Sequence, residues 1–204
     1  MPHPKDAHPD HAIEPLLVRR WSPYCFADQD VTTPDLLALL EAARWAPSSY
    51  NEQPWRYLLA RRSNAAAFAK LLSCLVEGNQ AWAKFAPVLL IGITIHTFAR
   101  NGKPNKAAAH DLGLASSNLS LEATARGLVV HQMIGIEPER VRELYSLPAH
   151  SEALTAIAIG YGGTGGNLPD ALAERDRTPR TRRPIDTFVF DDGWETPWRP
   201  GAPS

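Results

Sequence analysis

The run VLLIGITI at residues 88–95 is almost entirely apolar and rich in β-branched side chains. A strand with one wet face alternates apolar and polar residues, whereas a strand covered on both faces is a continuous apolar run. The segment ALTAIAIG, residues 153–160, has the same character. Both runs are far too short to cross a bilayer. The chain therefore has to fold so that both faces of its central strands are covered.

Apolar residues at spacings of three and four predict helices between these strands. Thr33 is the expected N-cap of the first, with Pro34 at the first helical position and the end before Pro47. Further elements are predicted as helices over 65–84 and 137–147 and as strands over 55–60 and 128–136. We therefore expect an α+β fold with at least four helices and three or four strands.

The helix predicted over 106–126 has small residues at positions that we expect to face inward. These residues are Ala108, Ala109, Gly113, Ala115 and Ser116. Small side chains let helix axes approach closely. This helix is therefore expected to be central, packed either inside the domain or against a second subunit.

Composition restricts the partners and the compartment. The 204 residues are 44% hydrophobic, which is enough for one substantial core, and the net charge of -1 implies no general attraction to nucleic acid or membrane. The two cysteines, Cys25 and Cys74, give neither a pairing framework nor metal-ligand spacing. Since no signal-peptide pattern opens the chain, we expect a soluble cytoplasmic protein without a metal site.

The two ends of the chain differ in amino-acid composition from its middle part. Residues 1–12 are rich in Pro, Asp and His and are expected to form a flexible tail, with a main domain over 13–190 and an extension over 191–204. From residue 164 onward the chain is rich in Pro, Arg and Asp, and is expected to be either disordered or laid across another surface. Its aromatic residues favour the second alternative: Phe188, Phe190, Trp194 and Trp198.

No familiar catalytic motif stands out. The sequence has no Walker-type loop, no GxGxxG and no Gly-x-Ser-x-Gly elbow. His110 with Asp111, or His131, could form a base with an orienting acid, although the sequence favours a structural histidine in the core or at an interface for each. We therefore expect no catalytic side chain, and a cofactor that brings its own chemistry.

Three separated clusters are suited to such a cofactor. RRWSPYCF (19–26) and RTPRTRRP (177–184) carry arginines, whose planar donors match phosphate oxygens. APSSYNEQPW (46–55) carries hydroxyls together with the amides of Asn51 and Gln53, which donate and accept at once and suit the mixed edge of a flavin pyrimidine ring. Each cluster alone could be a solvated charge run or a turn.

These clusters also carry a resemblance. RRWSPYCF, ARWAPSSYNEQPWRY, AAHDLGLASSNLSLEATARGL and the closing Arg-x-Arg before PIDTFV are similar, in order and spacing, to the nitroreductase family of FMN-dependent oxidoreductases. The resemblance covers residues 13–190. It implies a nitroreductase-like fold, with a mostly antiparallel sheet flanked by helices, and an intertwined homodimer with an extended C-terminal arm and two flavins at the interface.

The resemblance also implies the contacts of FMN. Arg20 and Ser22 would hold the phosphate with Arg180 and Arg182, Asn79 would reach the ring edge, and the backbone at Ile134 and Gly135 would approach flavin N5. The other implied contacts are Trp21, Tyr24, Pro47, Ser48, Ser49, Asn51 and Gln53, and the loop contacts are shared between subunits in the family.

Tyr24 stands where many members of the family carry Lys or Arg, close to flavin N1 and O2. A cation there stabilises the anionic reduced flavin. The sequence therefore predicts a flavin potential lower by tens of millivolts, since a partly buried cation contributes about 1–3 kcal/mol and about 1.4 kcal/mol corresponds to roughly 30 mV. Lys84 or Arg56 could replace the missing cation.

The function that the resemblance implies is transfer of hydride from NADH or NADPH through FMN to an electron-poor small molecule, such as a nitroaromatic or a quinone. Two alternatives remain open at this point. One is a flavin-binding protein without turnover, for storage or sensing. The other is a specialised branch that oxidises or dismantles a bound substrate or flavin.

Overall fold

The two continuous apolar runs form the inner strands of a sheet in the computed structural model, which describes residues 3–164 and 168–200. The four strands are all antiparallel, in the order β1-β2-β4-β3. They are β1 (Trp55–Arg61), β2 (Val88–Ile95), β3 (Val129–Met133) and β4 (Ser151–Gly160). β1 and β3 are the edge strands. The predicted α+β class and mostly antiparallel sheet are confirmed.

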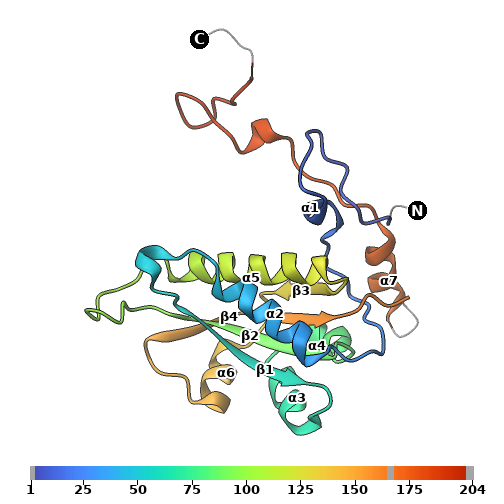
Figure 1. The fold of residues 1–204 in the computed structure, drawn as a ribbon, viewed down its shortest axis with the longest axis vertical. Helices are drawn as coiled ribbons and strands as arrows, with labels where there is room; N and C mark the ends of the chain where they lie inside the picture. Colours follow the sequence, from blue (N-terminus) through green and yellow to red (C-terminus); the bar gives the residue numbers. More distant parts are fainter. Residues whose placement is uncertain (1–2, 165–167, 201–204) are drawn as a thin grey trace.

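Helices cover both faces of this sheet (Figure 1). α2 and α5 lie on one face, and α3, α4 and α6 lie on the other. The helices are α1 (Pro15–Arg19), α2 (Thr33–Arg44), α3 (Ala65–Leu72), α4 (Glu77–Ala83), α5 (Ala108–Ala125), α6 (Pro138–Tyr145) and α7 (Asp170–Arg177), with short 3-10 turns η1 (Ser49–Asn51) and η2 (Ile185–Thr187). Within the described residues, none of these helices is long and apolar enough to cross a membrane.

Successive residues of β2 enter the two cores in turn, as strand geometry requires. Val88 and Leu90 belong to the core under α2 and α5, whereas Leu89 and Ile91 belong to the core over α3, α4 and α6. All four are essentially inaccessible to solvent. The continuous apolar pattern therefore follows from two cores that share one strand.

The single helix predicted over 65–84 is wrong, because the chain leaves the helix after Leu72 and re-enters it at Glu77. Between them Leu75 forms an antiparallel bridge with Ile136, and the Val76 N–H donates to the Gly135 carbonyl at 3.1 Å. Pairing with the segment after β3 thus interrupts the helix. The apolar spacing alone continues through the break and does not reveal it.

Two details of the helices facing β2 also correct the predictions. Thr32, not Thr33, is the N-cap of α2, where its hydroxyl accepts the Asp35 N–H at 3.1 Å. In α5 the small residues Ala108, Ala115 and Ser116 are buried as predicted, but Ala109 and Gly113 are exposed on the surface of this chain. The exposed pair leaves one side of α5 with little side-chain bulk.

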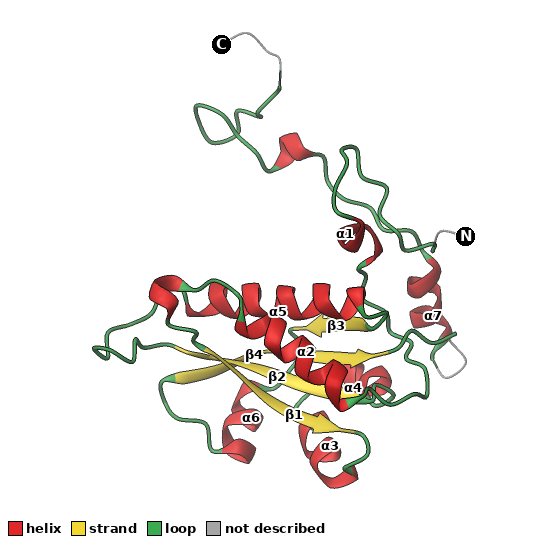
Figure 2. Cartoon of the chain, in the orientation of Figure 1, coloured by secondary structure: helices red, strands yellow, loops and turns green. Residues whose placement is uncertain are grey.

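The C-terminal segment leaves the body of the molecule as an extended arm beside the N-terminal segment (Figure 1; Figure 2). Lys5 lies at this contact, where its carbonyl accepts from Arg180 Nε at 2.5 Å and its Nζ donates to the Arg175 carbonyl. α1 and α7 are helices that the sequence analysis did not predict. Both are short, and α7 has no buried residue, so their periodicity is weak.

Candidate functional site

A cavity of about 590 Å³ lies along edge strand β3, between α5 and the start of α4. Its lining residues are Asn79, Ala109, Leu112, Gly113, Ser116, His131, Gln132, Met133, Ile134, Gly135, Leu154 and Thr155. β3 pairs with β4 on one side only, so its other edge carries backbone donors and acceptors that the sheet does not use. The cavity can therefore offer both main-chain polar groups and side chains to a ligand.

Three of the predicted site residues, Asn79, Ile134 and Gly135, line this cavity together. Asn79 Nδ2 donates to the Gly135 carbonyl at 2.9 Å. A Cβ at Gly135 would lie only 2.3 Å from Asn79 Nδ2 and 3.0 Å from Val76 Cγ2. A side chain at position 135 would therefore have to displace the Asn79 amide, which the broken helix described above brings to this point.

The guanidinium groups of Arg20, Arg180 and Arg182 lie close enough to interact electrostatically, and the charge of Arg20 also acts on His131, which lines the cavity. Arg20 follows α1 and donates to Ser22 Oγ at 3.1 Å. Burial, followed by the nearby charges of Arg180 and Arg182, lowers the pKa of Arg20, and no ion pair involves Arg20 among the described residues. Since a partly buried charge without a counter-charge is unfavourable, this cluster is suited to an anionic ligand.

Arg180 also makes hydrogen bonds to the main chain around Arg20. Its guanidinium donates to three main-chain carbonyls, those of Lys5, Val18 and Arg20, at 2.5, 2.6 and 2.7 Å. Arg182 is exposed and donates to the carbonyl of Thr181. Arg180 therefore fixes the backbone that carries Arg20, while its charge adds to the positive potential.

The predicted contacts Trp21 and Tyr24 lie on either side of Ser22 and point to different surroundings. The Trp21 ring packs against the His3 ring in a tilted arrangement at a centroid distance of 4.9 Å, with Lys5 Nζ 5.9 Å from the centre of the Trp21 ring. The Tyr24 ring packs edge-on against Trp82, at 5.2 Å, and against His131, at 4.7 Å. Tyr24 itself is not among the residues that line the cavity, whereas His131 is.

The two cations that could stand in for a basic residue at position 24 are engaged elsewhere. Arg56 donates to the carbonyls of Gln53 and Trp55, and Lys84 Nζ lies 5.1 Å from the centre of the Phe85 ring. Neither residue lines the cavity. Of the residues that line the cavity, His131 is the one whose side chain carries a titratable nitrogen.

The loop after α2 adopts a strained backbone. Tyr50, Asn51 and Gln53 all have positive φ angles, of 52°, 55° and 52°, which a bulky residue such as tyrosine rarely adopts. The loop is held by Ser48 Oγ, which accepts the Gln53 N–H at 3.0 Å, and by Asp111 Oδ2, which accepts the Ser49 N–H at 3.0 Å. Such strain costs of order 1–3 kcal/mol per residue and concentrates at functional sites.

Within one chain this loop and the arginine cluster do not meet. η1 lies at the N-terminal end of α5, next to Asp111, whereas α1 and Arg20 lie towards its other end (Figure 1). The predicted loop contacts are absent from the lining of the cavity; they are Pro47, Ser48, Ser49, Asn51 and Gln53. In this chain the amides of Asn51 and Gln53 bond to each other at 3.1 Å.

Asp176 is a structural residue of the site that the sequence analysis missed. Its carboxylate accepts the N–H groups of Tyr24 and Cys25 at 2.9–3.0 Å and thereby attaches α7 to the segment that follows Ser22. Gln132 and Thr155, which line the cavity, were missed as well. An acid nine residues after a Gly-Gly-Asn stretch gives no signal of its own, because only the fold brings α7 to residue 24.

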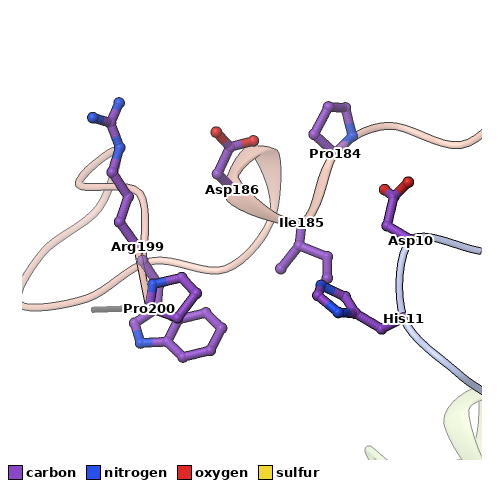
Figure 3. A pocket seen from close by; sticks show the side chains of 8 residues that line it. Asp10, His11, Pro184, Ile185, Asp186, Arg199 and Pro200 are labelled. Carbon is purple, nitrogen blue, oxygen red and sulfur yellow. The ribbon is translucent and has the colours of Figure 1, made fainter. Parts of the chain in front are cut away.

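A second cavity, of about 320 Å³, lies between the N-terminal segment and the arm (Figure 3). It is formed by residues 10–11 of the N-terminal segment and by residues 184–186 and 198–200 of the arm. It contains none of the predicted cofactor contacts. Because the arm itself contributes most of its wall, we regard it as a consequence of how the two ends cross.

Comparison with known proteins gives one family. The model of the "Nitroreductase family" matches residues 17–161. The chain is 32% identical to Protein DrgA of Synechocystis, over 65% of this chain and 75% of that protein. It is 29% identical to a protein named NADH dehydrogenase from Thermus thermophilus, over 64% of this chain and 77% of that protein.

Solved structures agree. A crystal structure described as an oxidoreductase containing FMN is 34% identical, covers 92% of this chain and 95% of its own, and superposes with a TM-score of 0.86. A nitroreductase family protein from Clostridium difficile, at 23% identity and a TM-score of 0.67, covers 88% of this chain and 97% of its own and shares the fold.

Proposed function

Because the chain belongs to the nitroreductase family, we propose that it is an oxidoreductase that binds FMN and uses NADH or NADPH to reduce an electron-poor small molecule, such as a nitroaromatic or a quinone. The observation that carries the proposal is the partly buried Arg20, grouped with two further arginines and close enough for its charge to act on His131, which lines the cavity along the edge strand. The phosphate of FMN matches the arginines, and the flat polar ring of FMN matches the cavity.

The chain's residues divide the task of holding the cofactor. Arg20 and Ser22 would hold the phosphate, with the charges of Arg180 and Arg182 in support. Asn79 and the main chain at Ile134 and Gly135 would bind and orient the ring along β3. When bound, FMN supplies the chemistry of accepting a hydride and passing it on.

The exposed position of Ile134 supports a site that a second flat molecule can enter. Its side chain is 87% exposed, although it lines the cavity, so this side of the site opens outward. A nicotinamide and then an acceptor could occupy that opening in turn. No acid or base side chain is needed to make or break a bond in either step.

Anaerobic titration of the FMN-loaded protein with NADH, and separately with NADPH, tests the proposal. We expect the flavin absorption to bleach with one equivalent of at least one of them, and a nitroaromatic or quinone to restore it. A protein that binds FMN but stays oxidised with both nicotinamides would instead be a flavin-binding protein. A protein that fails to bind FMN would overturn the proposal.

We also propose that the site is completed in a homodimer, in which the loop of one copy reaches the cavity of the other. The separation of η1 from the arginine cluster within one chain supports this arrangement, as does the exposed strip of Ala109 and Gly113 on α5. In addition Trp45, just before the loop, is 72% exposed. A strained loop that serves no site of its own chain is best explained by a site in its partner.

Mixing two inactive variants tests the shared site. One is Arg20→Gln; the other replaces both Asn51 and Gln53 by glycine, which tolerates their positive φ angles. Each variant alone should lose most FMN binding. After the two are unfolded and refolded together, about one quarter of the sites should regain it, because half of the dimers are mixed and each mixed dimer has one intact site. No recovery in the mixture would show that each site uses one chain only.

A further inference from the structure

His131 is held in the cavity wall in a fixed orientation. Its Nδ1 lies 2.9 Å from the Pro23 carbonyl, which can only accept, so Nδ1 carries the proton. Its ring is packed against Trp82, at 4.5 Å, and Tyr24, at 4.7 Å. Among the described residues nothing is hydrogen-bonded to Nε2, although His131 lines the cavity. A neutral ring thus presents one unpaired acceptor at the site.

The groups around His131 set its protonation. Burial lowers the pKa of His131; the hydrogen bond that its ring donates to the Pro23 carbonyl and the carboxylate of Asp176 oppose this shift, and the charge of Arg20 adds to it. On the other packed elements, Trp82 of α4 and Ala158 of β4 bring no charge, and Tyr24 holds its hydroxyl 3.4 Å from Arg175 Nη1. The ring is therefore neutral at neutral pH until a negative charge is placed beside it.

The position of His131 along β3 places it beside the proposed flavin. His131 and Gly135 line the same cavity and are four residues apart, which places them at most about 13 Å from each other along the chain. Asn79 and Gly135 mark one part of the proposed ring site, and His131, in the same cavity wall, is close enough to Arg20 for that charge to act on it. Tyr24 occupies the position at which many members of the family carry a basic residue. Its ring packs edge-on against His131, and Tyr24 does not itself line the cavity.

We propose that His131 gains a proton at Nε2 when the bound flavin is reduced, so that a titrating histidine takes the place of a permanent cation beside the anionic ring. This inference rests on the proposed function. Hydride from the nicotinamide delivers two electrons and one proton to the flavin. The further proton on His131 comes from solvent and returns to solvent when the hydride passes to the acceptor.

The number of protons taken up on reduction distinguishes this arrangement. Near neutral pH we expect the FMN-loaded protein to take up about two protons per two electrons, and the His131→Gln variant about one, as measured from the pH dependence of the midpoint potential. His150→Gln, in an exposed turn, is the matched control and should behave as the parent protein. Equal proton uptake in the parent and His131→Gln would overturn the proposal.

A second measurement needs no variant. Nitrogen NMR of the histidine rings in the FMN-loaded protein should show His131 Nε2 unprotonated in the oxidised form and protonated after reduction by dithionite. An unchanged Nε2 signal would overturn the proposal even if His131→Gln did not fold. Failure of the proposed function would look different, because FMN would then not bind, or not be reduced by either nicotinamide.

Discussion

Replacing Arg20 by glutamine is expected to weaken the binding of FMN about 100-fold, which corresponds to roughly 2.7 kcal/mol. The physical reason is the loss of a charge-assisted bond to phosphate from a partly desolvated guanidinium. The apoprotein should keep its free energy of unfolding or gain slightly, because Arg20 lies close to two other positive charges. Titration of the apoprotein with FMN, followed by flavin fluorescence, measures the effect.

Riboflavin, which lacks the phosphate, provides the control ligand for this variant. Its affinity should change little in Arg20→Gln. The neighbouring Arg19 is exposed and provides the control variant, since Arg19→Gln should bind FMN as the parent does. Equal losses for FMN and riboflavin, or an equal loss in Arg19→Gln, would mean that Arg20 does not contact the phosphate.

Replacing Gly135 by alanine is expected to destabilise the protein by about 2–3 kcal/mol, through overpacking and a lost hydrogen bond. The added methyl group would lie 2.3 Å from Asn79 Nδ2, and Asn79 would have to leave the Gly135 carbonyl. Denaturant unfolding of the apoprotein measures the cost. Gly78→Ala, in the same helix as Asn79 but with nothing within 4 Å, should instead stabilise by up to about 1 kcal/mol.

The double variant with Asn79→Ala identifies the colliding group. Asn79→Ala alone should cost about 1 kcal/mol, and the two changes together should cost at least about 1 kcal/mol less than their sum, because the alanine at 79 no longer meets the new methyl group. Strictly additive costs would show that the collision at Gly135 is with the backbone or with Val76.

Short sequence patterns predicted the strands and helix ends that depend on residues near one another in the chain. The runs in β2 and β4 announced strands buried on both faces, and Thr-Pro marked the start of α2 to within one residue. The break between α3 and α4 was not predictable in this way, since it exists only because Leu75 pairs with Ile136, some sixty residues later. α7 was missed for a similar reason, as its main anchor is the distant pair of N–H groups at Tyr24 and Cys25.

For the candidate site too, some residues were predicted from the sequence, whereas the roles of others depend on contacts between distant parts of the chain. Asn79, Ile134 and Gly135 were predicted by resemblance, and the fold brings these three together. That Arg180 would brace the backbone near Arg20 through three carbonyls could not be read from an arginine run. His131 was noticed, but its packing against Tyr24 and Trp82 and its free Nε2 depend on residues more than forty positions away.

The unpaired edge of β3 has a consequence for how the protein behaves when no ligand is bound along that edge. A sheet edge that is not paired with a further strand can pair with a strand from another molecule, which is a common route to aggregation. A tricyclic flavin ring bound along the edge of β3, as proposed, would block such pairing. Supply of the vitamin-derived coenzyme would then govern how much of the polypeptide stays dispersed, as well as how much of it is active.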